Sequence, residues 1–280
     1  MLTWAFWHAL RHPPARNPLF RRAYTAPEQP IPWYIGCVQG FGILLFLPIL
    51  AFAGLIYSIG WSVGIANLIG KERVRGTFDL LSLCPSGPLG MSWAIATGYL
   101  YHHRTFKNIT SPGNVFIRVM LAGSLIALVD LQALLAPGVD WTILLWTLLS
   151  RLAAAAVALY IDQVQSLVLG ALVGMVMPGI ARERVNAQLY AFAAYIGAQL
   201  ATYFVTIMVG FYLIPLLFDR LSLAGIGADA VIVLLRLALF FGTRELLIRL
   251  LWRRLVEQLN PDPGEIRTLL RAHVGGFPRY

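Results

Sequence analysis

The chain has 280 residues, of which 58% are hydrophobic and 12% are charged, and its mean hydropathy is +0.70. Average soluble domains contain about 25% charged residues. This composition therefore excludes a soluble domain and predicts an integral membrane protein. The formal net charge of +9 fits Arg and Lys retained on the cytoplasmic side of a membrane, and we expect no nucleic-acid partner.

The first 32 residues are amphipathic and basic. Trp4, Phe6, Trp7 and Leu10 recur at helical spacing, and four arginines follow at positions 11, 16, 21 and 22. Two interpretations stay open: a helix in the lipid headgroup layer with its arginines on anionic lipid, or a helix packed on the protein. Because Arg11 and two prolines interrupt the apolar stretch, we predict no cleaved signal peptide.

Residues 33–70 contain no charged side chain. As a single helix this segment would be about 57 Å long, whereas the hydrocarbon layer of a bilayer is about 30 Å thick. We therefore predict two short spans joined by an outer turn near Pro48 and Gly54, residues that do not continue a helix comfortably. Such a hairpin returns Lys71 to the side of the N-terminal arginines.

The apolar run ends abruptly in a charged segment. Its five charged residues lie within nine positions: Lys71, Glu72, Arg73, Arg75 and Asp79. We predict a short amphipathic helix over 71–83 that lies near the membrane surface and ends before Pro85. Its inward face is predicted to consist of Val74, Phe78 and Leu81.

The remaining chain alternates between apolar runs and short charged segments. A helix over 91–104 is expected on or near the cytoplasmic surface, with a short span as the alternative. Further spans are predicted over 115–136, within 141–179, over 188–217 and from 230, followed by a short tail helix around 266–273. The segment I-A-R-E-R-V at 180–185 echoes L-I-G-K-E-R-V at 68–74, which indicates a weak internal repeat.

The distribution of positive charge predicts the topology. Segments 1–32, 71–113, 181–188 and 244–280 hold 18 of the 22 Lys and Arg residues, which places them inside. The parity then requires six spans with both termini cytoplasmic, and residues 141–158 become an outer interfacial or re-entrant piece. The alternative is eight spans, with one over 88–104 and two within 141–180. The expected domains are a cytoplasmic segment 1–32, a transmembrane domain 33–252 and a cytoplasmic tail 253–280.

Five charged residues fall inside the predicted spans: Arg118, Asp130, Arg151, Asp162 and Arg236. An unpaired charge in a bilayer costs about 3 kcal/mol or more, so these side chains should pair within the bundle or line a polar pathway. Tyr160, Gln163, Gln165 and Gln199 are further candidates for polar lining. The sequence lacks a phosphate-binding loop, a zinc-protease motif and a serine-hydrolase elbow, so we predict no catalytic activity, no metal and no cofactor in this chain.

The charged segment carries a family resemblance. The sequence E-R-V-R-G-T-F-D-L-L at 72–81, followed by Cys84-Pro85, resembles the membrane subunit of type-2 ATP-binding-cassette exporters. Asn17-Pro18 with Arg21 and Arg22, ahead of the first span, resembles the cytoplasmic lead-in of that family. The resemblance implies six spans and a coupling helix that docks on a separate ATPase. The implied coupling residues are Glu72, Arg73, Arg75, Thr77, Phe78 and Asp79.

The resemblance implies a multi-pass permease of the cell membrane, an exporter subunit. ATP and Mg²⁺ would bind the partner ATPase, and two permease subunits would pair as a homo- or heterodimer within the lipid bilayer. The alternative function is a non-transporting membrane scaffold in a larger complex. An intramembrane enzyme that uses Asp130 or Asp162 is disfavoured, because no nucleophile or metal set accompanies either aspartate.

Overall fold

The computed structural model describes residues 1–25, 53–82, 86–103, 105–106, 111, 113, 141–181, 183–220 and 226–271. Every regular element within these residues is a helix, which confirms the predicted all-α class. The first span of the predicted hairpin, the span over 115–136 and the two cysteines lie outside the described residues.

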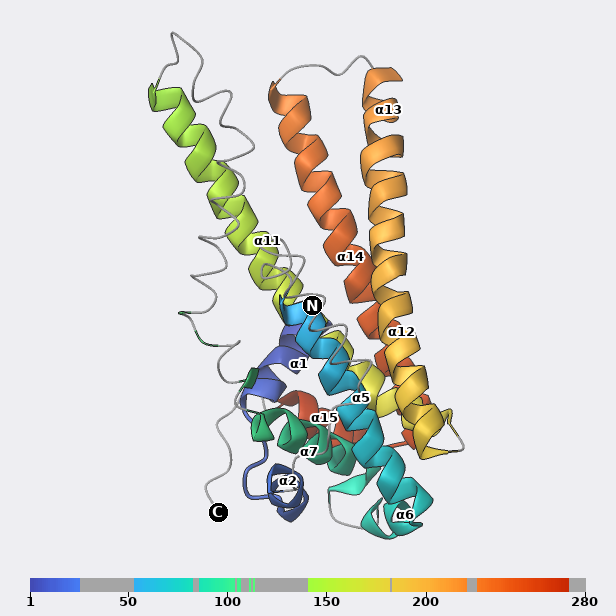
Figure 1. Ribbon diagram of the computed structural model, residues 1–280. Helices are drawn as coiled ribbons and strands as arrows, with labels where there is room; N and C mark the ends of the chain where they lie inside the picture. The colour runs from blue at the N-terminus through green and yellow to red at the C-terminus, as the bar shows by residue number, and fades with distance from the viewer. Residues whose placement is uncertain are drawn as a thin grey trace.

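Long helices form the main body of the structure. They are α5 (Ala53–Val74), α11 (Trp141–Val176), α12 (Arg184–Val205) with its continuation through the π-helix η2 (Thr206–Leu213) into α13 (Ile214–Arg220), and α14 (Ile226–Leu259). Figure 1 shows α11, α13 and α14 projecting from one end of the molecule, with the shorter helices gathered at the other. Among the described residues, Ala156–Gly179 and Arg184–Arg220 are long and apolar enough to cross a membrane.

Helix α11 corrects the prediction for 141–179. It is one helix of 36 residues, or about 54 Å long, so a re-entrant piece over 141–158 is wrong, while the outer interfacial location of these residues stays a prediction. The two spans that the eight-span alternative required there are also wrong. The physical reason is local, because no Pro or Gly interrupts the sequence from Trp141 until Gly170.

Helices α5 and α11 run parallel and approach through small residues. A Cβ atom added at Gly170 would lie 2.9 Å from the carbonyl oxygen of Ser58, and one at Gly174 would lie 2.7 Å from that of Ser62. Small residues four apart on both helices allow this close backbone contact, which is the usual packing device of membrane helices. The crossing therefore fixes α5 against α11.

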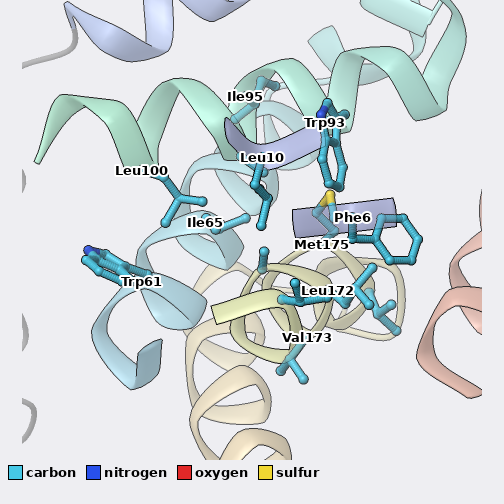
Figure 2. Close-up of a cluster of buried hydrophobic side chains, with 14 of the residues drawn as sticks. Phe6, Leu10, Trp61, Ile65, Trp93, Ile95, Leu100, Leu172, Val173 and Met175 are labelled. Atoms are coloured by element: carbon cyan, nitrogen blue, oxygen red, sulfur yellow. The ribbon is translucent and has the colours of Figure 1, made fainter. Parts of the chain in front are cut away.

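The shorter helices α1 (Leu2–Arg11) and α7 (Gly87–His102) pack alongside the long helices α5 and α11. Helix α1 buries Phe6, Trp7 and Leu10, so of the two interpretations the structure supports a helix packed on the protein. Figure 2 shows Phe6 and Leu10 among apolar side chains of α5, α11 and α7. Trp4 is the partly exposed member of the predicted face, and its ring stacks on that of Tyr160 at 6.0 Å.

Carboxylates from the C-terminal region cap two of these helices. Glu245 accepts a hydrogen bond of 2.6 Å from the backbone N–H of Leu2 and another from the hydroxyl of Thr3. Glu265, on α15 (Pro263–Arg271), accepts one of 3.3 Å from the N–H of Leu89. The first N–H groups of a helix lack partners within it, so these contacts tie α1 and α7 to the end of the chain.

Helix α7 is a buried core helix. Its residues from Met91 to Gly98 are all buried, and it packs against α5 and α2 (Pro18–Tyr24). Gly98 permits the contact with α2, since an added Cβ would lie 2.7 Å from the carbonyl oxygen of Phe20. The predicted helix over 91–104 is therefore present. The tail helix predicted around 266–273 is also present, as α15.

Helices α12 and α13 differ from this packed end. The segment Arg184–Arg220 is highly apolar, yet little of it is buried inside the protein. Its exposed large side chains include Leu189, Leu200, Phe204, Met208, Phe211 and Leu216. A large exposed apolar surface requires an apolar environment, which supports membrane association.

Candidate functional site

The charged segment forms an elbow, defined here as residues Lys71–Ser82. Helix α5 continues through Lys71, Glu72 and Arg73 and ends at Val74, and helix α6 (Thr77–Ser82) then begins. Gly76 lies between them with a φ of +69°, the left-handed region that favours glycine. The prediction of one helix over 71–83 is therefore wrong, because Gly76 divides it.

Glu72 fastens the elbow from inside. Its side chain accepts a hydrogen bond of 2.5 Å from the hydroxyl of Thr77, across the Gly76 turn. The guanidinium of Arg22 in α2 donates to the other carboxylate oxygen at 3.0 Å. Glu72 is only 9% exposed, so this carboxylate joins α2, α5 and α6.

A cleft of about 290 Å³ opens beside the elbow. Arg73 lies on one wall with its guanidinium 4.3 Å from the centre of the Phe78 ring. Burial lowers the pKa of the Arg73 guanidinium, and the nearby charge of Asp79 opposes that shift. Glu183, in the turn after η1 (Met177–Gly179), also lines the cleft. The segments 68–74 and 180–185, which echo each other in sequence, therefore meet at this site.

The outer face of the elbow is open to solvent. Arg75 and Asp79 are exposed, and the apolar side chains of Val74 and Leu80 are 63% and 69% exposed. Phe78 is buried as predicted, but Val74 points outward because α5 ends at that residue. The side chain of Leu81 lies outside the description.

A buried polar network joins α11, α12 and α14 above the elbow. Arg244 is fully buried and forms an ion pair with Asp162. Its guanidinium also donates to the side-chain oxygens of Ser166 at 3.1 Å and Gln199 at 2.6 Å. Gln199 in turn donates to the hydroxyl of Tyr195 at 3.0 Å.

Arg236 occupies a different environment on α14. Its Nε donates to the backbone carbonyl oxygen of Gly210 at 2.9 Å, and its guanidinium lies 4.2 Å from the centre of the Phe211 ring. Both partners belong to the π-helical segment η2. π-Helical turns occur frequently at functional sites.

Comparison of the chain with protein-family models, with curated proteins and with solved structures found no match. Its function is therefore inferred from these contacts.

The predicted coupling residues occupy two environments. Glu72 and Thr77 bond to each other, and Phe78 is buried, so these three side chains do not form an outward surface. Arg75 and Asp79 are exposed, and Asp79 also lines the cleft together with the partly buried Arg73. The motif marked this segment as distinct, but its spacing predicted one helix and could not show which side chains the Gly76 turn directs inward.

The predicted intramembrane charges do not meet at one place. Asp162 pairs with Arg244, and Arg236 bonds to a backbone carbonyl in η2. Arg118 and Asp130 lie outside the described residues, and Arg151 belongs to α11 with its side chain outside the description. Of the four predicted polar residues, Gln199 bonds Arg244, Gln165 bonds the backbone of Phe241 at 3.1 Å, Gln163 is buried and Tyr160 stacks on Trp4.

Arg244 is the functional candidate that sequence reasoning missed. It opens the basic run of residues 244–254 and was therefore assigned to the cytoplasmic side. The available signal was Asp162, an isolated aspartate in an apolar segment that requires a cation. Within the described residues, no group of three or more His, Cys, Asp or Glu side chains is arranged to hold a metal ion.

Proposed function

We propose that this chain is the membrane-spanning permease subunit of an ATP-driven exporter, and that a separate ATP-binding-cassette subunit docks on the outer face of the elbow. The observation that carries the proposal is the construction of the elbow. Its inner side is fastened by Glu72 to two other helices, while its outer side exposes Arg75, Asp79 and Leu80.

Such a construction suits a lever. A chain without an ATP-binding loop can be driven only if a partner's movement is transmitted mechanically to its spans. Helix α5 continues directly into the elbow and packs on α11 through Gly170 and Gly174. A force applied at α6 would therefore reach α11, whose residues from Ala156 are apolar enough to span.

The directions of the helices support six spans with both termini on the elbow side. Helices α5 and α11 run toward the elbow, as the contacts of Ser58 with Gly170 and of Ser62 with Gly174 require. Helix α12 runs away from it, and α14 returns, because Gln199 meets Arg244 while Gly210 meets Arg236. In this scheme one span precedes α5 and another lies over 115–136.

Sidedness follows from charge. Arg22, Lys71, Arg73 and Arg75 lie at the elbow end of the molecule, together with the basic half of α14. Positive residues are retained on the cytoplasmic side, which is where an ATPase is available. The proposed location is therefore the cell membrane, with the elbow in the cytoplasm and two permease subunits per complex.

The first test is whether the reading frame beside this chain encodes an ATP-binding-cassette ATPase, and the second is co-expression of that ATPase with this chain. The wild-type chain should co-purify with the ATPase in detergent. Asp79→Arg and Leu80→Asp, both on the outer face, should abolish the complex, whereas Arg253→Ala on the exposed side of α14 should not. Circular dichroism would establish that all variants remain folded.

Two outcomes contradict the proposal. In one, the complex forms equally well with Asp79→Arg and Leu80→Asp, so the elbow is not the docking surface. In the other, the wild-type chain binds no ATPase and purifies from its native membrane with a different assembly. That second outcome would favour a membrane scaffold.

A further inference from the structure

We propose that Arg236 binds the acidic group of an amphipathic substrate, whose apolar part lies along the exposed surface of η2 and α14. The inference rests on the proposed transport function and names its substrate class, a hydrophobic carboxylate or phosphate. It is carried by how Arg236 is held, by its position along the helices and by its surroundings.

The side chain of Arg236 is held by a carbonyl that its own helix cannot satisfy. In η2 the N–H of Ile214 bonds to the carbonyl of Val209, five residues earlier. The next bond in this register would join residue 215 to Gly210, but residue 215 is a proline and has no N–H. The carbonyl of Gly210 therefore accepts from the Nε of Arg236 instead.

This arrangement leaves the amino groups of the guanidinium available. Nε is used by Gly210, and the planar group lies against the Phe211 ring. The described residues provide no carboxylate for Arg236, in contrast to the ion pair that Asp162 forms with Arg244. Within the described residues, the positive charge is thus oriented by a carbonyl and a ring and has no carboxylate partner.

If the ends of α13 and α14 lie at the membrane surface, as the proposed function implies, Arg236 lies deep in the bilayer. It is ten residues from the start of α14 at Ile226, and Gly210 is ten residues from the end of α13 at Arg220. At about 1.5 Å per residue, both lie about 15 Å from this end of the helices, close to the middle of the hydrocarbon layer. A free arginine would extend toward the interface, but the bond from Nε restrains this one.

The side chains around Arg236 indicate that the rest of the ligand is apolar. Exposed large apolar side chains flank both bonded residues in sequence: Phe211 and Tyr212 follow Gly210, and Val233 and Leu235 precede Arg236. A charge in this setting is costly unless it faces a counter-ion or a polar pathway. An acidic group joined to an alkyl or aryl body would satisfy both the cation and the apolar surface.

Binding of spin-labelled stearate to the full chain in phosphatidylcholine nanodiscs tests the inference. We expect immobilised label with wild-type protein and much less with the spin-labelled methyl ester, which lacks the charge. Arg236→Gln should weaken stearate binding roughly ten- to hundredfold, the usual range for a lost charge-assisted hydrogen bond. Arg253→Gln, which removes an exposed cation from the same helix, should leave binding unchanged.

The glutamine variant separates binding from packing. Gln can still donate to the carbonyl of Gly210, so thermal unfolding should change little while binding falls. Equal binding of stearate and its methyl ester, or equal binding by wild type and Arg236→Gln, would overturn the inference. No ATPase is present in this measurement, so failure of the complex with the ATPase is a separate result.

Discussion

Arg236 and Arg244 lie eight residues apart on α14, but their charges are stabilised in different ways. Arg244 is fully buried among three helices and has a carboxylate, a hydroxyl and an amide as partners. Arg236 has a backbone carbonyl and an aromatic ring, and its surroundings are exposed apolar side chains. Arg244 is therefore part of the buried core, whereas the charge of Arg236 lies at a partly exposed apolar surface.

The different environments of Arg236 and Arg244 follow from how tightly the helices are packed on the two sides of Arg244 along α14. Toward the elbow, α5, α7 and α1 cover α11 and α14, and a paired charge there can be enclosed. Toward the far end, the described helices leave α12 and α13 largely uncovered. Among the described residues, a charge there is stabilised by its own helix pair, in this case by the carbonyl of Gly210, which Pro215 leaves without a backbone donor.

The largest expected effect is the loss of the partner of Arg244. Asp162→Leu should destabilise the protein by about 3–5 kcal/mol, because it leaves a buried guanidinium unpaired. The midpoint of thermal unfolding in detergent, followed by circular dichroism, would measure this loss. Arg236→Met, which removes the less buried arginine, should cost far less.

A double variant checks the cause of that loss. Asp162→Leu combined with Arg244→Met removes both charges and should recover much of the stability, since apolar residues often replace a buried ion pair at little cost. If the double variant is as unstable as Asp162→Leu alone, the lost stability belongs to packing around residue 162 and not to the unpaired charge.

The crossing of α5 and α11 should be the next most sensitive place. Gly174→Ala places a methyl group 2.7 Å from the carbonyl oxygen of Ser62 and 2.8 Å from the Cβ of Ile65. Both neighbours belong to a packed helix, so the two helices must separate, at an expected cost of about 1–3 kcal/mol. A cost near zero would show that α5 moves freely on α11 and would argue against transmission from the elbow.

The sequence predicted the kinds of elements well and their connections less well. The all-α class follows from long apolar runs, and the position of the elbow follows from five charges after an uncharged segment. The unbroken length of α11 could also have been predicted, because no Pro or Gly lies between Trp141 and Gly170. We set residues 141–158 apart because the parity of six spans left no place for another crossing, but a single helix can extend beyond the bilayer.

The composition of the candidate sites was harder to predict. Glu72 and Thr77 were expected to face a partner ATPase because the family resemblance implied it. Gly76 instead reverses the chain locally and brings the two side chains together. Arg244 is the first residue of a basic run, and the sequence does not show that three helices pack around it. The link between Pro215 and Arg236 depends on a π-helical register that helical periodicity does not reveal.

A smaller effect is expected where the start of α1 contacts Glu245 of α14. Glu245→Gln removes the negative charge that accepts from Leu2 and Thr3, so the first turn of α1 should be weakened by about 1 kcal/mol. Hydrogen exchange of the α1 amides would report it, with faster exchange in the variant confined to that helix. Faster exchange spread over α11 and α14 would instead mean that Glu245 supports the neighbouring network of Arg244.

The smallest effect should come from a glycine on the uncovered helix. Gly197, in the middle of α12, has no atom within 4 Å of the position of an added Cβ. Gly197→Ala should therefore raise stability by about 0.5–1 kcal/mol through helix propensity alone, the opposite sign to Gly174→Ala. Parallel melts of the two variants test the contrast between packed and open ends directly. Loss of stability in Gly197→Ala would show that this face of α12 is occupied in the native protein, and a second permease subunit would be its first candidate.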